Sequence, residues 1–159
     1  MAENEHEHEN ENEMAIRHAT DADVLTCARI DAENFHFILE PQRIKLLRRA
    51  LAWQGVLVAM VGNALAGYAI FDPDWFDSTF LKLIVVDKRF RRRGIAERLI
   101  ERIENKHCPS GRFFSSTEED NAASRALHQK LGFVESGYLA NLPQPQHEVF
   151  YFKNVSARR

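Results

Sequence analysis

A basic turn between an apolar strand and an amphipathic helix is the most constraining feature of this sequence. Residues 79–86 are almost continuously apolar, which predicts a strand buried on both faces. Five basic side chains follow between residues 88 and 93, and Gly94 ends the run. Apolar residues then recur every four positions over 95–103, so a helix is expected through about residue 106. The sequence therefore predicts a strand, a tight turn and a helix in direct succession.

The start of this helix has the chemistry of an anion site. The first N–H groups of a helix lack intrahelical acceptors, and the helix dipole adds partial positive charge. Gly94 and Ala96 are small enough for a phosphate to approach the backbone. The basic run alone is also typical of a nucleic-acid patch, but its place between a strand and a helix favours phosphate binding. It contains neither a Walker pattern nor a dinucleotide-binding glycine pattern.

A second helix is predicted over residues 121–131, closed by Gly132. Asn121, Ser124 and His128 share one face of it, and Asn121 and His128 are about 10.5 Å apart along the axis at a rise of 1.5 Å per residue. That face could follow an elongated ligand. Asn121 is also a typical helix cap, and an isolated His is more often a structural residue. The core stripe is expected to consist of Ala123, Leu127 and Leu131.

The remaining pattern indicates a mixed α/β sheet. Gly62-Asn63 between two apolar runs signals a hairpin, whereas Asp72-Pro73-Asp74 is expected to break the second of those strands and start a loop to Ser78. The predicted order is β-α-α-β-β-β-α-β-α-β-β, which combines hairpins with one strand–helix–strand crossover. The other strands are expected at residues 14–18, 112–116, 133–139 and 149–153, and the other helices within 20–35 and 41–54.

Composition excludes several classes of protein. The chain has 159 residues, two Cys and a net charge of −2, which fits one cytoplasmic domain without structural disulfides. The acidic residues 1–13 are expected to be a disordered tail, and without them the rest is about +4, too weakly basic to favour nucleic acid. Neither a membrane span nor a metal motif occurs. The domain is expected over 14–153, followed by a short tail at 154–159.

Together, the two helical units resemble the GNAT (GCN5-related N-acetyltransferase) superfamily. Its acetyl-CoA loop reads [QR]-x-x-G-x-[GA], which corresponds here to Arg91-x-x-Gly94-x-Ala96. Its later helix carries an Asn, then an aromatic or His position, then a hydrophobic-Gly-Phe ending. Asn121, His128 and Leu131-Gly132-Phe133 match this in order and spacing. The resemblance covers about residues 14–153.

This resemblance implies an acyl-CoA acyltransferase fold of the α/β (α+β) class, with a mixed, splayed central sheet of about six to seven strands and about four flanking helices. Acetyl-CoA is the implied cosubstrate. His128 stands where many members have Tyr and is the candidate general acid for the leaving thiolate, while the general base is unassigned. The implied cofactor-binding residues are Ile84, Val85, Val86, Arg91, Arg92, Arg93, Gly94, Ile95, Ala96, Asn121 and His128.

Three functions remain open at this stage. The first is an N-acetyltransferase that passes acetyl to an amine, on a small molecule or a peptide, by direct attack. The second is an acyl-CoA-binding regulatory module without turnover, and the third is a nucleic-acid-binding protein. The resemblance assigns acceptor choice to the first two helices and the loop before the last strand, here including residues 33–37 and 141–148. A homodimer is also left open, and no membrane partner is expected.

Overall fold

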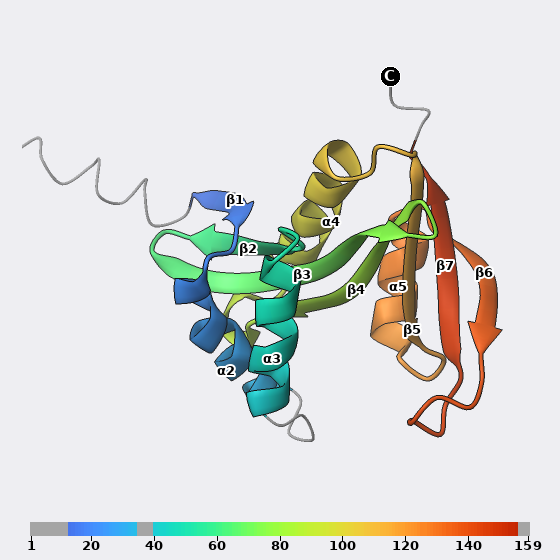
Figure 1. The fold of residues 1–159 in the computed structure, drawn as a ribbon, viewed down its shortest axis with the longest axis horizontal. Helices are drawn as coiled ribbons and strands as arrows, with labels where there is room; N and C mark the ends of the chain where they lie inside the picture. The colour runs from blue at the N-terminus through green and yellow to red at the C-terminus, as the bar shows by residue number, and fades with distance from the viewer. Residues whose placement is uncertain (1–12, 35–39, 156–159) are drawn as a thin grey trace, which may run out of the picture. The chain divides into compact units, whose positions relative to one another are not determined.

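The computed structural model describes residues 13–34 and 40–155 (Figure 1). Most of the two expected tails, and part of the segment 33–37, lie outside these ranges. The described elements are β1 (Met14–His18), the 3₁₀ helix η1 (Asp21–Asp23), α2 (Val24–Asn34), α3 (Glu40–Leu51), β2 (Val56–Val61), β3 (Ala64–Trp75), β4 (Ser78–Val86), the 3₁₀ helix η2 (Lys88–Phe90), α4 (Ile95–Lys106), β5 (Arg112–Glu118), α5 (Ala122–Lys130), β6 (Val134–Leu139) and β7 (Glu148–Asn154).

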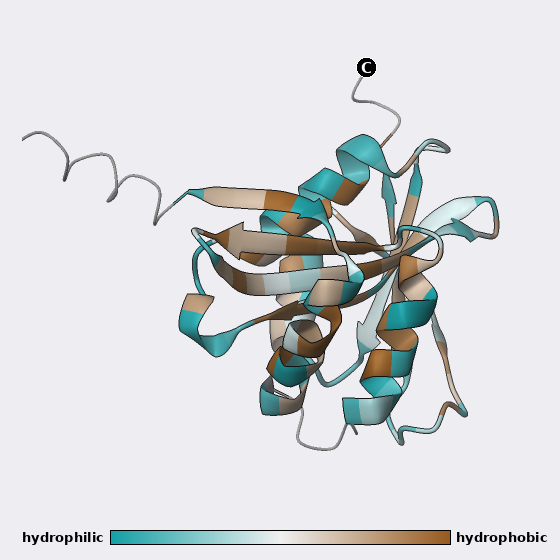
Figure 2. Cartoon of the chain, turned by 60° about the vertical axis from the view of Figure 1, so that its left-hand side comes forward, coloured by the Kyte–Doolittle hydropathy of each residue, from teal (hydrophilic) through white to brown (hydrophobic). Residues whose placement is uncertain are grey.

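Within the described residues, seven strands form one mixed sheet in the order β1-β2-β3-β4-β5-β7-β6. With the four α-helices, this confirms the expected fold class. Apolar residues run along the strands, and the helices carry polar and apolar stretches in turn (Figure 2). No helix among the described residues is long and apolar enough to cross a membrane. The chain divides into two compact units, which are described separately.

The first unit, residues 1–71 and 83–102, has a core built from two helices and the first strands. Ala28 of α2 and Leu47 of α3 are fully buried together with Val58 and Tyr68 of β2 and β3. A buried ion pair also joins the two helices, since Arg43 Nε donates to Asp31 Oδ2 at 2.6 Å. The helices are therefore fixed to each other and to the sheet.

The turn between β3 and β4 corrects a sequence prediction. Asp72-Pro73-Asp74 does not break the strand, because β3 continues through Trp75. Pro73 is exposed, and a proline is tolerated in a strand where its missing N–H is not needed for pairing. The reversal instead uses Phe76 and Asp77, whose φ angles are +50° and +55°. Positive φ at both central residues is the geometry of a two-residue type I′ hairpin turn.

The second unit, residues 72–82 and 103–159, contains α5 and the antiparallel strands β5, β7 and β6. Along β5, Phe113, Ser115 and Thr117 are buried, whereas the residues between them are half-buried. The expected core stripe of α5 is partly wrong. Ala123 is exposed, Leu127 and Leu131 are half-buried, and His128 is the buried residue of this helix. The helix packs through the His128 ring, which offers a larger contact surface than the methyl group of Ala123.

Candidate functional site

The end of β4 is only half-buried. β4 pairs in parallel with β5 from Thr79–Phe113 to Leu81–Ser115, and no further pair joins these two described strands. Val85 is buried, but Ile84 and Val86 are half-buried and Lys82 is exposed. Burial on both faces was therefore a wrong expectation for this half of the strand. The strand stops pairing with β5 before its apolar residues end.

Gly67 of β3 allows close packing against the end of β4. A Cβ at Gly67 would lie 2.8 Å from the Val85 carbonyl oxygen and 3.2 Å from a methyl carbon of Ile95. Real Cβ atoms essentially never come this close to a backbone oxygen. Glycine therefore allows β3, the end of β4 and the start of α4 to pack closely. The sequence shows only a glycine inside an apolar strand, which is the general signal of a close backbone approach.

The basic turn is braced by Asp87, a residue that the sequence analysis did not single out. Its backbone N–H donates to the Ala66 carbonyl at 2.8 Å, and its carboxylate accepts from the Arg89 backbone N–H at 2.9 Å and from the Arg89 guanidinium at 2.7 Å. The hydrogen bonds from Arg89 lower the pKa of Asp87 below its usual value. Asp is a typical residue at the cap of a helical turn, and Asp87 caps η2 in this way.

Two cations of the turn also lie over one ring. The guanidinium carbons of Arg89 and Arg93 are 5.6 and 5.3 Å from the centroid of the Phe90 ring, within the range of cation–π contacts. Arg91, Arg92 and Arg93 are exposed to solvent. The turn thus presents positive charge at the surface while Asp87 and Phe90 fix its shape.

The turn ends in the geometry of an anion site. Gly94 has a φ of +71°, and no atom lies within 4 Å of the position that a Cβ would take. The first intrahelical bond of α4 runs from the Arg98 N–H to the Gly94 carbonyl at 3.1 Å. The N–H groups of Ile95 and Ala96 therefore precede the helical ladder and can point at an anion. A pyrophosphate could therefore bind here, because there is open space above Gly94, the neighbouring arginines are exposed and a twelve-residue helix begins at this point.

Asn121 caps α5 within the second unit. Its Oδ1 accepts a hydrogen bond from the Ser124 backbone N–H at 3.1 Å, which satisfies one of the N–H groups at the helix start. The side chain itself is exposed. The structure thus gives Asn121 the capping role, and its amide group remains at the surface.

His128 is 5% exposed, and both ring nitrogens are hydrogen-bonded. Nδ1 lies 2.7 Å from the Ser124 carbonyl oxygen and Nε2 lies 2.7 Å from Ser115 Oγ. Because a carbonyl only accepts, Nδ1 carries a proton. The ring also stacks on Tyr151, with centroids 4.4 Å apart. Burial lowers the pKa of His128 below its usual value, partly offset by the bond to Ser124, so the neutral ring is favoured and Nε2 accepts from the Ser115 hydroxyl.

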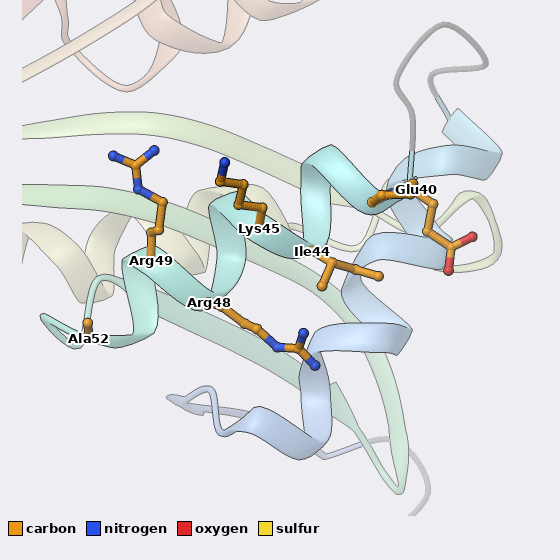
Figure 3. A pocket seen from close by; sticks show the side chains of 7 residues that line it. Glu40, Ile44, Lys45, Arg48, Arg49 and Ala52 are labelled. Carbon is orange, nitrogen blue, oxygen red and sulfur yellow. The ribbon is translucent and has the colours of Figure 1, made fainter.

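A separate pocket lies along the outer side of α3, within the first unit (Figure 3). Lys45 and Arg49 extend from one side of the helix, while Arg48 extends from another and lies 3.4 Å from the exposed Asp21 carboxylate. The pocket is open and lined by Glu40, Pro41, Ile44, Lys45, Arg48, Arg49 and Ala52. Since one helix and its end supply the whole lining, it offers no converging set of reactive groups.

Open space above Gly94 at the start of a helix, next to a half-buried strand end, makes this turn a candidate site for the phosphates of a cosubstrate. Residues 23–133 match the sequence profile of the acetyltransferase (GNAT) family, and the chain belongs to that family. Its members are acyltransferases that use acetyl-CoA, so this chain is an acetyl-CoA-dependent acetyltransferase. The resemblance inferred from the two motifs is confirmed.

Two curated relatives give the nearest context on function. An L-amino acid N-acyltransferase from Escherichia coli is 33% identical over 103 residues, which is 60% of this chain and 58% of that protein. An L-methionine sulfoximine/L-methionine sulfone acetyltransferase from Salmonella typhimurium is 30% identical over 151 residues, covering 82% of this chain and 84% of that protein.

Solved structures agree on the fold. A GNAT-family acetyltransferase from Bacillus cereus has a TM-score of 0.80 and 26% identity, covering 90% of this chain and 98% of that one. A putative acetyltransferase from Salmonella typhimurium, solved with its cofactor acetyl-CoA, has a TM-score of 0.72 and 21% identity, covering 91% and 95%. At that identity, the second likeness supports the fold alone.

Proposed function

We propose that this protein transfers the acetyl group of acetyl-CoA to the amino group of a small amino-acid-like acceptor. The observation that carries the proposal is the turn at Gly94, where open space, a positive φ and exposed arginines meet at the start of α4. The amine nitrogen attacks the acetyl carbonyl, the C–S bond breaks, and the thiolate leaves and takes up a proton. The ammonium formed on the product loses one proton to a base that is not assigned.

The first unit supplies most of the proposed cofactor contacts. Backbone N–H groups of Arg91, Arg92, Arg93, Gly94, Ile95 and Ala96 would hold the pyrophosphate. Backbone groups of Ile84, Val85 and Val86 would hold the pantetheine arm, since β4 no longer pairs with β5 beyond Leu81. The exposed amide of Asn121 is proposed as a further cofactor contact.

The catalytic role of His128 rests on a hydrogen-bonded connection. Its Nε2 contacts Ser115 Oγ, and that hydroxyl lies 3.5 Å from the Leu81 carbonyl, at the last pair of β4 with β5. To act as the general acid, the neutral ring must first take up a proton on Nε2. It would then pass that proton to the thiolate through Ser115, or directly if Ser115 moves aside. Ser115→Ala and His128→Phe should then both lower kcat, by about 10²–10⁴ for His128→Phe, with little change in KM for acetyl-CoA.

The choice of acceptor class follows the curated relatives. Both act on amino acids or amino-acid analogues by name, and the second matches most of this chain. Peptide amino groups are the next acceptors to test. A cytoplasmic location and a homodimer belong to the same proposal, and they are tested by cell fractionation and by light scattering on the purified protein.

One experiment tests the function directly. Acetyl-CoA is incubated with L-amino acids, their sulfone and sulfoximine analogues, polyamines and peptide N-termini, and the release of free CoA thiol is measured. Turnover with an amino-acid-like amine supports the proposal. Tight binding of acetyl-CoA without turnover on any amine would instead support a regulatory module that binds acyl-CoA.

A further inference from the structure

A second concave site lies entirely within the second unit. It is a groove of about 410 Å³, a volume typical of small-molecule sites. Its walls are mainly aromatic, and its polar side-chain groups belong to Trp75, Ser136 and Tyr138. The lining residues are Trp75, Phe76, Phe114, Ser136, Gly137, Tyr138, Leu139 and Phe150.

The rings in this groove are already arranged for stacking. Trp75 stacks on Phe80 with centroids 4.8 Å apart, and its plane is 12° from that of Phe150 at 6.0 Å. Tyr138 is in turn stacked on His147 at 4.7 Å. Aromatic walls that hold each other in place bind a flat ring at little conformational cost.

Phe76 provides independent evidence that the groove is more than a packing gap. It is 83% exposed and has a φ of +50°, a conformation that is costly for a bulky residue. Glycine or asparagine is the usual residue at such a turn position. A strained backbone and an exposed aromatic ring at the edge of a concave site together indicate that the ring is kept for contact with a ligand.

Within the second unit, the groove and α5 lie on opposite faces of β5. Phe114 is adjacent to Ser115, the last β5 residue that pairs with β4. Because side chains alternate along a strand, Phe114 faces away from Ser115 and His128, and therefore away from α5. Direct attack requires the amine to approach from a side that the cofactor arm leaves open. If α5 contacts the cofactor, the face that carries Phe114 is that side.

We propose that this groove binds an aromatic side chain of the amine acceptor and so selects aromatic amines and amino acids. The inference rests on the proposed acetyl transfer, and it adds the chemical class of the acceptor. Amines without a ring would lack the stacking contacts and react less well. The specificity then comes from residues of β3, β5, β6 and β7.

Intrinsic fluorescence tests binding without any turnover. The chain has two Trp residues, so Trp53→Phe leaves Trp75, in the groove, as the only reporter. Titration with 2-phenylethylamine should change the fluorescence and saturate, whereas ethylamine should not. In the same background, Phe114→Ala and Tyr138→Ser should each weaken binding by about 10-fold. Leu25→Ser, which changes an exposed apolar residue of the first unit, is the matched control and should leave it unchanged.

Phe76→Gly separates a ligand contact from a structural role. Glycine relieves the positive φ, so the melting temperature should stay constant or rise while the affinity for 2-phenylethylamine falls. A lower melting temperature with unchanged affinity would contradict the inference. Light scattering on the same variants tests whether the groove is instead a dimer interface. Loss of a dimer with unchanged affinity for 2-phenylethylamine would assign the groove to contact between two copies of the chain and overturn the proposal.

The outcomes also separate this inference from the proposed function. A saturable thermal shift with acetyl-CoA, without a fluorescence response to 2-phenylethylamine, would overturn the inference and leave acetyl transfer intact. Equal kcat/KM for 2-phenylethylamine and ethylamine would do the same. Absence of any acetyl-CoA shift would overturn the proposed function, whatever the groove binds.

Discussion

Replacing Gly94 by Ala should separate the conformational need for glycine from its role in binding. At a φ of +71° a Cβ costs about 1–2 kcal/mol, and in a chain of this size that lowers Tm by roughly 2–8 °C. No atom lies within 4 Å of the new methyl group, so no clash adds to this cost. The methyl group would instead occupy the space where a phosphate approaches the N–H groups of Ile95 and Ala96.

Gly132→Ala is the matched control. Gly132 has a φ of +84°, and a Cβ there meets only the Lys153 side chain, at 3.8 Å, so the conformational cost is the same. Wild-type protein and Gly132→Ala should both gain about 2.7 kcal/mol at 100 times the Kd for acetyl-CoA, measured as a thermal shift. Gly94→Ala should gain much less at that concentration. An equal gain for the two variants would refute the assignment of the phosphate site to this turn.

Three further outcomes follow from buried contacts. Gly67→Ala should lower the free energy of unfolding by about 1–3 kcal/mol in a denaturant titration, because its Cβ would lie 2.8 Å from the Val85 carbonyl oxygen; an unchanged midpoint would contradict the close packing. Arg43→Met alone should cost about 3–5 kcal/mol because it leaves the buried Asp31 carboxylate unpaired, whereas Arg43→Met with Asp31→Leu should recover most of the loss. Because burial lowers the pKa of His128, the unfolded chain binds a proton more readily than the folded one. Stability should therefore fall as the pH drops below about 6.5, and His128→Phe should reduce this slope; an unchanged slope would contradict the assignment.

Local pattern was sufficient for the elements around the candidate site. The apolar run, the basic turn and the four-residue repeat predict a strand, a turn and a helix, and the structure has β4, η2 and α4 there. The positive φ of Gly94 was not predicted. The turn at Phe76-Asp77 was missed because the local signals pointed elsewhere. Asp tolerates a positive φ but a bulky Phe does not favour it, and Asp72-Pro73-Asp74 carries the stronger local turn signal. The hairpin position is set instead by the pairing of β3 and β4 in the sheet, which outweighs local preference.

Contacts between distant segments could not be predicted in this way. Ser115 gave no signal in the sequence, yet its hydroxyl lies 2.7 Å from His128 Nε2 and occupies the ring nitrogen that the Ser124 carbonyl leaves available. The aromatic groove combines residues from four separate segments, and no single one of them signals a groove. The sequence therefore indicates that a histidine is available for proton transfer. Its burial and its two hydrogen-bond partners, the Ser124 carbonyl and the Ser115 hydroxyl, determine which proton it can give or take. If His128 acts in catalysis, the proton it handles passes through Ser115 or requires Ser115 to move, so Ser115→Ala is the variant whose kcat reports on the histidine without removing it.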